Sequence, residues 1–177
     1  RFWLETKVIS MSNVDSGVEV FYEMADGQNS VTAAKVLLST GRRSVINGFG
    51  LENLNLELIN NKAIGVDNHM CTTVPGVYAC GDITGYSLLA HTAVREGEVA
   101  VHHILGKDDE MSHCAIPAAV HANPAIVGLG YLEESTQKKR IAYYTLQLPM
   151  AYSGRIVAQN VGVKGVCKLA LTHDRTI

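Results

Sequence analysis

The sequence predicts an α/β unit with β-rich segments on both sides of it. Residues 35–39 and 76–80 are continuous apolar runs, which are typical of strands buried on both faces of a sheet, and each run leads into a turn that contains glycine. Residues 87–105 carry apolar side chains at helical spacing. A strand, a tight turn and a helix in this order predict an α/β architecture.

The flanking segments predict short strands, and those in the first 36 residues are expected to be antiparallel. Residues 7–9 and 18–22 are expected strands in the first 36 residues, with turns at 15–17 and 26–27. The polar, asparagine-rich stretch 50–75 contains one weak strand, at 63–66. After residue 115, strands are expected at 116–120, 125–130, 142–148 and 166–171.

The predicted helix has a face of small residues. Ser87 is the expected N-cap and Gly106 the expected stop signal. The inner face is predicted to hold Ala90, Ala93, Val94, Gly97, Val101 and Ile104, whereas Arg95, Glu96 and Glu98 are predicted to face solvent. Such small inner residues predict close packing of the helix on a sheet.

Composition excludes several classes of protein. The 177 residues are 47% hydrophobic and 18% charged, which excludes a disordered chain. A net charge of −2 without a basic patch argues against a nucleic-acid partner, and no apolar run of about 18 residues is present to span a membrane. The four cysteines form no C-x-x-C pair and the histidines no ligand spacing, so no metal site is predicted. Reduced, mostly buried thiols favour a cytoplasmic protein.

Gly81 and Asp82 are the first candidate site. They follow the second apolar run, and the carboxyl ends of strands in open α/β sheets are where ligands bind. Asp82 would accept hydrogen bonds from sugar-like hydroxyl groups, and the helix that begins six residues later would present free N–H groups and a positive dipole end. The alternative, an aspartate that only closes a turn, is equally open on these residues.

Three segments together resemble the pyridine nucleotide–disulfide oxidoreductases. The runs T-T-V-P-G-V-Y-A-C-G-D at 72–82 and L-L-A-H-T-A-V-R-E-G at 88–97 look like the family's second FAD-binding motif. The run at 38–43 resembles the segment where the chain returns from the NAD domain to the FAD domain. Residues 116–134 look like the start of the interface domain. The L-A-H-x-A-x-x-E-G pattern is most similar to that of dihydrolipoamide dehydrogenases.

The resemblance implies cofactors and site residues. Asp82, preceded by Gly81, would bind the ribityl chain of FAD, and Gly41 would lie near the nicotinamide cofactor NAD. The residues that would line the flavin edge, mainly by backbone, are Leu88, Leu89, Ala90 and His91. For His91, a packing or capping role is the competing interpretation. By resemblance the parent protein would be a homodimer, with a lipoyl-bearing 2-oxo-acid dehydrogenase complex as a further partner.

The resemblance also implies a division of the chain. Residues 1–36 would end an NAD-binding domain, 37–114 would form the second half of a Rossmann-like FAD-binding domain, and 115–177 would begin an α+β interface (dimerisation) domain. The G-x-G-x-x-G loop, the redox-active C-x-x-x-x-C pair and the catalytic His-Pro are absent from this sequence. We therefore expect a piece of a longer dihydrolipoamide dehydrogenase that is inactive alone and contains no catalytic residue. There are two alternatives: a stand-alone dimerisation or interaction module, and a part of a mercuric- or glutathione-type reductase.

Overall fold

The structure is a computed structural model, and it describes residues 1–131, 133–159, 162 and 164–172. The chain divides into two compact units, Arg1–Arg42 and Arg43–Ile177. The last five residues of the predicted interface segment, 173–177, lie outside the described residues.

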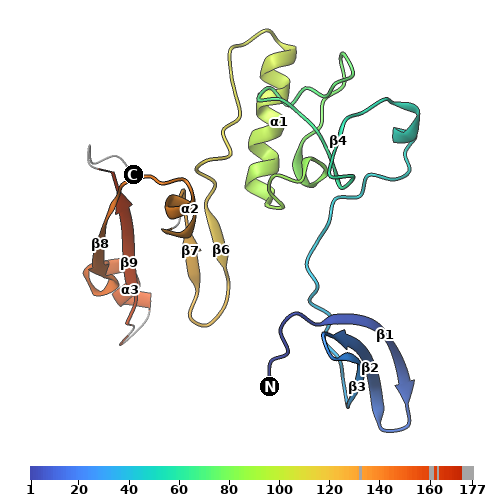
Figure 1. The fold of residues 1–177 in the computed structure, drawn as a ribbon. Helices are drawn as coiled ribbons and strands as arrows, with labels where there is room; N and C mark the ends of the chain where they lie inside the picture. Colours follow the sequence, from blue (N-terminus) through green and yellow to red (C-terminus); the bar gives the residue numbers. More distant parts are fainter. Residues whose placement is uncertain (132, 160–161, 163, 173–177) are drawn as a thin grey trace. The chain divides into compact units, whose positions relative to one another are not determined.

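The first unit is a three-stranded antiparallel meander (Figure 1). Its strands are β1 (Lys7–Val14), β2 (Gly17–Met24) and β3 (Gly27–Ala33), with β2 in the middle. The strands and both turns expected for the first 36 residues are confirmed. Tyr22 on β2 is buried and stacks on Trp3, with ring centroids 5.4 Å apart.

The apolar run 35–39 is not a strand, so that prediction is wrong. Leu37 is 90% exposed and Leu38 is 65% exposed. All strand pairs among the described residues are antiparallel and join neighbours in sequence, so no parallel sheet is present there to take up this run. A run this apolar gains burial only when strands lie on either side of it.

The second unit opens with short elements. These are the 3₁₀ turn η1 (Leu51–Asn53), the strand pair β4 (Leu58–Ile59) and β5 (Ala63–Ile64), and the 3₁₀ turn η2 (Gly81–Thr84). The weak strand expected at 63–66 is confirmed over its first two residues. Residues 76–80 were expected to form a fully buried strand, but they pair only through a single bridge between Cys71 and Tyr78, and Cys80 is exposed. That prediction is wrong for the same reason as that for 35–39.

Helix α1 (Ala90–Ile104) confirms the predicted helix and its stop signal. Gly106 has φ +69°, its N–H bonds the carbonyl of His103 at 3.0 Å, and the N–H of Lys107 bonds the carbonyl of His102 at 2.9 Å. This pair of bonds is a Schellman motif. The expected cap is wrong, because Leu89 is the N-cap residue and Ser87 instead contacts the hydroxyl of Thr92 at 3.0 Å.

The buried face of α1 differs from the predicted one. Its buried residues are Thr92, Glu96, Val99 and Ala100. The three largest residues of the predicted inner face are exposed by 53–63%: Val94, Val101 and Ile104. The helix has apolar residues on both flanks, and in this chain the core of Met70, Val99, Ala100 and Met111 covers only one of them.

The described residues after 115 form two hairpins and two short helices, with one 3₁₀ turn (Figure 1). The first hairpin joins β6 (Ala118–Val120) to β7 (Ile126–Gly128), and the second joins β8 (Tyr144–Pro149) to β9 (Val166–Leu171). Helix α2 (Glu133–Lys138) lies between the two hairpins in sequence. The 3₁₀ turn η3 (Met150–Tyr152) and helix α3 (Gly154–Gln159) lie between β8 and β9, within the second hairpin. The four strands expected after residue 115 are confirmed with somewhat different ends.

The cysteines are free, as expected, but they are not mostly buried. Cys80 and Cys114 are exposed, and Cys71 and Cys167 are partly buried. Within the described ranges, no helix is both long enough and apolar enough to cross a membrane.

Candidate functional site

Gly81 begins a tight turn that presents Asp82 to solvent. Its φ of +79° is one that glycine adopts without strain, and a Cβ added there would lie 3.3 Å from the Cβ of Ala93 on α1. Asp82 is exposed, and its backbone carbonyl accepts hydrogen bonds from the hydroxyl of Ser44 and from the N–H of Gly85. The turn is therefore fixed through the backbone of Asp82, while the residue itself stays at the surface.

The turn is closed at its other end by Thr84 and Gly85. The buried hydroxyl of Thr84 donates to the carbonyl of Gly81 at 2.9 Å. Gly85 has φ +70°, and a Cβ there would lie 2.6 Å from the Cβ of Ala63 on β5. This close approach packs η2 against the short β4–β5 hairpin.

The helix start that follows has no side-chain cap. Leu89 is the N-cap residue and makes no side-chain cap hydrogen bond, and the first turn contains no acidic residue. The N–H groups of the first turn therefore keep their capacity to bind an acceptor. His91 is exposed, and its Nε2 lies 2.9 Å from the carbonyl oxygen of Pro117.

The structure brings most of the predicted site residues into one segment. Gly81 and Asp82 lie in η2, and Leu88 to His91 lie at the start of α1, within the same unit. Gly41 belongs to the other unit, where it is exposed and has φ +80°. Its predicted place beside a nicotinamide stays a prediction.

Glu96 contributes to this segment, although the sequence pattern placed it on the solvent face. Its side chain is fully buried, and its Oε2 accepts a hydrogen bond from the N–H of Gly81 at 2.6 Å. Its Oε1 lies 2.9 Å from Nε2 of His113. The helical spacing of Thr92, Glu96, Val99, Ala100 and His103 is the sequence signal that identifies this second face.

A polar cluster surrounds the C-terminal end of α1. Nδ1 of His103 lies 2.8 Å from the hydroxyl of Tyr78 and 3.5 Å from Sγ of Cys71, and its ring stacks on His69. Burial raises the pKa of the Cys71 thiol, so this cysteine is held as a thiol rather than activated as a thiolate. No group of three or more His, Cys, Asp or Glu side chains in the described part of the chain is placed to hold a metal ion.

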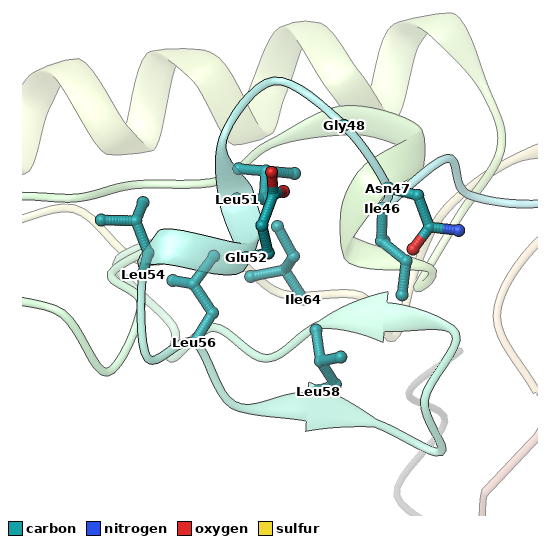
Figure 2. Close-up of a pocket in the computed structure, with 9 residues that line it drawn as sticks. All are labelled: Ile46, Asn47, Gly48, Leu51, Glu52, Leu54, Leu56, Leu58 and Ile64. Carbon is teal, nitrogen blue, oxygen red and sulfur yellow. The ribbon is translucent and has the colours of Figure 1, made fainter.

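An aliphatic cavity of about 430 Å³ lies beside the β4–β5 hairpin. Figure 2 shows Ile64 among the leucine side chains that line it. The lining residues are Ile46, Asn47, Gly48, Leu51, Glu52, Leu54, Leu56, Leu58 and Ile64. None of the predicted site residues lines this cavity, and it presents few polar groups to a cofactor, so the turn at Gly81 remains the better candidate.

Comparisons with known proteins agree on one family. The family described as pyridine nucleotide-disulphide oxidoreductase matches residues 1–97. The chain is 35% identical over 160 residues to dihydrolipoyl dehydrogenase of Geobacillus stearothermophilus, covering 90% of this chain and 34% of that protein. It is 32% identical to the mitochondrial dihydrolipoyl dehydrogenase 1 of Arabidopsis thaliana, covering 89% of this chain and 32% of that protein.

Solved structures give the same result for the fold. LpdA from Mycobacterium tuberculosis matches with a TM-score of 0.80 and 26% identity over 95% of this chain and 36% of that one. The HOCl-induced flavoprotein disulfide reductase RclA from Escherichia coli matches with a TM-score of 0.73 and 22% identity, over 95% of this chain and 38% of that one, which supports the fold alone. The chain spans about a third of the length of these relatives.

Proposed function

This chain belongs to the pyridine nucleotide-disulphide oxidoreductase family, and we propose that it supplies part of the FAD site of a dihydrolipoamide dehydrogenase. Such an enzyme transfers electrons from dihydrolipoamide to NAD, with FAD as the redox carrier between them. The names of the relatives favour this type over a mercuric or glutathione reductase. The observation that carries the proposal is the exposed Asp82 on the Gly81 turn, followed by the uncapped start of α1.

The residues present fit a flavin cofactor in three respects. Gly81 lacks a side chain where a Cβ would crowd Ala93, Asp82 offers exposed carboxylate oxygens to ribityl hydroxyls, and the first turn of α1 has no competing side-chain cap. We assign Leu88, Leu89, Ala90 and His91 to the flavin edge through their backbone. When bound, FAD supplies the two-electron redox chemistry, and the helix dipole of α1 would favour negative charge near its start.

The remaining assignments follow the same family comparison. We propose that residues 1–36 end the NAD-binding domain, 37–114 complete the FAD-binding domain and 115–177 begin the interface domain. Gly41 would then lie near NAD at the domain junction, and the parent protein would be a homodimer that serves a lipoyl-bearing 2-oxo-acid dehydrogenase complex. Four free thiols support a cytoplasmic location, where cysteines stay reduced.

The FAD assignment is tested by substituting Asp82 in the full-length protein. Loss of hydrogen bonds to a charged group costs about 1.5–3 kcal/mol, so Asp82→Ala should weaken FAD affinity about 10–100-fold. Asp108→Ala removes another exposed carboxylate of the same unit and should leave the affinity unchanged. Equal FAD affinity of Asp82→Ala and the unmodified protein, measured by flavin fluorescence, would remove Asp82 from the site.

The chain is proposed to be inactive by itself. It contains neither a C-x-x-x-x-C pair nor the His-Pro acid–base residue that the proposed reaction requires. With NADH, lipoamide and added FAD, the 177 residues should therefore give no turnover above background. Measurable NADH oxidation that depends on lipoamide would contradict this.

A further inference from the structure

The buried carboxylate of Glu96 links three parts of the second unit that are distant in sequence. It accepts the N–H of Gly81 from η2 at 2.6 Å and contacts Nε2 of His113 at 2.9 Å, while Glu96 itself lies on α1. A carboxylate is removed from water at a large cost unless hydrogen bonds satisfy it, and both of its oxygens are satisfied here. This degree of burial and pairing sets Glu96 apart from Glu98, two residues away, which is 56% exposed.

His113 reaches the same turn by a second contact. Its ring stacks on Tyr86, with centroids 4.5 Å apart and an angle of 23° between the ring planes. Tyr86 follows η2 in sequence, and its hydroxyl donates to the carbonyl of Val66 at 3.5 Å. Glu96 therefore holds the segment 81–86 at its first residue, and His113 holds both Glu96 and the last residue of that segment.

Because Asp82 lies inside the segment that is held at both ends, we propose that Glu96 and His113 are positioning residues for the Asp82 carboxylate and the start of α1. This inference rests on the proposed FAD site. Neither residue is required to touch the cofactor. Their role is to fix the Gly81 backbone so that Asp82 projects from a rigid turn. A binding residue that is already fixed in the free protein loses less conformational entropy when the ligand binds.

Two substitutions of Glu96 test whether its role depends on its hydrogen bonds or on its negative charge. In Glu96→Gln, the amide oxygen accepts from Gly81, and the amide N–H₂ donates to His113 in its other neutral tautomer. In Glu96→Met, a side chain of similar length leaves the Gly81 N–H and His113 without a partner. Glu98→Met is the matched control, since it makes the same change at an exposed position of the same helix.

The first measurement needs no cofactor. Amide hydrogen exchange at Gly81 should accelerate at least tenfold in Glu96→Met, stay within threefold of the unmodified protein in Glu96→Gln, and be unchanged in Glu98→Met. His113→Leu should give an intermediate acceleration of Gly81 exchange, because it removes the contact of His113 with Oε1 of Glu96 but leaves the Gly81 hydrogen bond to Oε2 in place. Equal Gly81 exchange in all four variants would overturn the proposal.

The second measurement is FAD affinity in the full-length protein, with Asp82→Ala in parallel. Glu96→Met should weaken FAD binding at least tenfold with an altered visible flavin spectrum, and Glu96→Gln should restore both. If Asp82→Ala weakens binding but Glu96→Met does not, the positioning role is wrong and the FAD site stands. If Asp82→Ala has no effect, both are wrong. If Glu96→Met does not fold, unchanged FAD affinity and Gly81 exchange in His113→Leu would overturn the proposal instead.

Discussion

Arg95 on α1 and Asp109 in the segment after the helix form an ion pair with two hydrogen bonds. His102 adds a contact from Nδ1 to Oδ2 of Asp109 at 2.7 Å. Hydrogen bonds from Arg95, and then from His102, hold the pKa of Asp109 well below its usual range. The ion pair thus fastens the segment that leads to His113 onto the helix that carries Glu96.

The Asp109 contacts predict a stability that depends on pH. A carboxyl group with a lowered pKa in the folded state stabilises the fold above its unfolded-state pKa of about 4, and that contribution is lost as the pH falls through the folded-state value. Asp109→Asn should therefore lower the urea midpoint at pH 7 and make a smaller difference at pH 3. Both side chains of the Arg95–Asp109 pair are partly exposed, so the effect should be modest.

Urea unfolding followed by circular dichroism at the two pH values provides the measurement. Asp108→Asn, at the exposed position next to it, should leave the midpoint unchanged at both. If Asp109→Asn lowers the urea midpoint as much at pH 3 as at pH 7, the ionised Asp109 carboxylate is not the cause of the lost stability.

A matched pair of valines tests which face of α1 is the core. Val99 is fully buried and Val101 is 53% exposed, and both lie in the same helix. Val99→Ala should cost about 2 kcal/mol through lost burial and a residual cavity, whereas Val101→Ala should cost close to nothing. The change in helix propensity is the same in both variants and cancels from their difference. Equal destabilisation in denaturant unfolding of the 177 residues would place both faces of α1 in a core.

Gly85 and Gly106 separate backbone strain from steric overlap. Their φ angles are +70° and +69°, but a Cβ at Gly85 would lie 2.6 Å from the Cβ of Ala63, whereas a Cβ at Gly106 would meet nothing within 4 Å. Gly106→Ala should cost about 1–2 kcal/mol from the left-handed backbone alone. Gly85→Ala should cost about 1–3 kcal/mol more, because Ala63 is anchored to its strand. Similar unfolding free energies for Gly85→Ala and Gly106→Ala would show that the turn at Gly85 can move away from the β4–β5 hairpin with no loss of stability.

The sequence predicted local elements better than it predicted burial. The strands and turns of the first 36 residues, the helix with its Gly106 stop signal, and the individual strands after residue 115 depend on turn residues and periodicity within a few positions, and these were predicted. The buried strands at 35–39 and 76–80 depend on neighbouring strands that the described residues do not supply. The pattern was typical of strands buried on both faces of a sheet, but a strand is buried only where its partner strands are present.

Glu96 shows the corresponding limit for the site. A glutamate beside an arginine on an amphipathic helix is usually solvated. Because Val94 and Val101 are apolar, the face that carries them was predicted to be buried, but both residues are exposed. Among the described residues, His113, where the chain returns to the helix, and Gly81 provide the hydrogen-bond partners of the carboxylate. Contacts over 15 and 17 residues do not follow from helical spacing alone.

Cys71 should react more slowly with alkylating agents than the two exposed cysteines. Burial raises the pKa of its thiol, and the thiolate is the reactive form. At pH 7.5, iodoacetamide should therefore modify Cys80 and Cys114 first and Cys71 more slowly, since a raised pKa leaves a smaller fraction of the Cys71 thiol ionised.

The pH profile gives the same prediction a second readout. The labelling rate of Cys71 should continue to rise at pH values where an ordinary thiol, with a pKa of about 8.5, has levelled off. Peptide mass spectrometry after timed labelling assigns each rate, and in urea all four cysteines should react alike because burial no longer acts. Native labelling of Cys71 as fast as that of Cys80 at pH 7.5 would mean that the His103–Tyr78 cluster activates the thiol instead of shielding it.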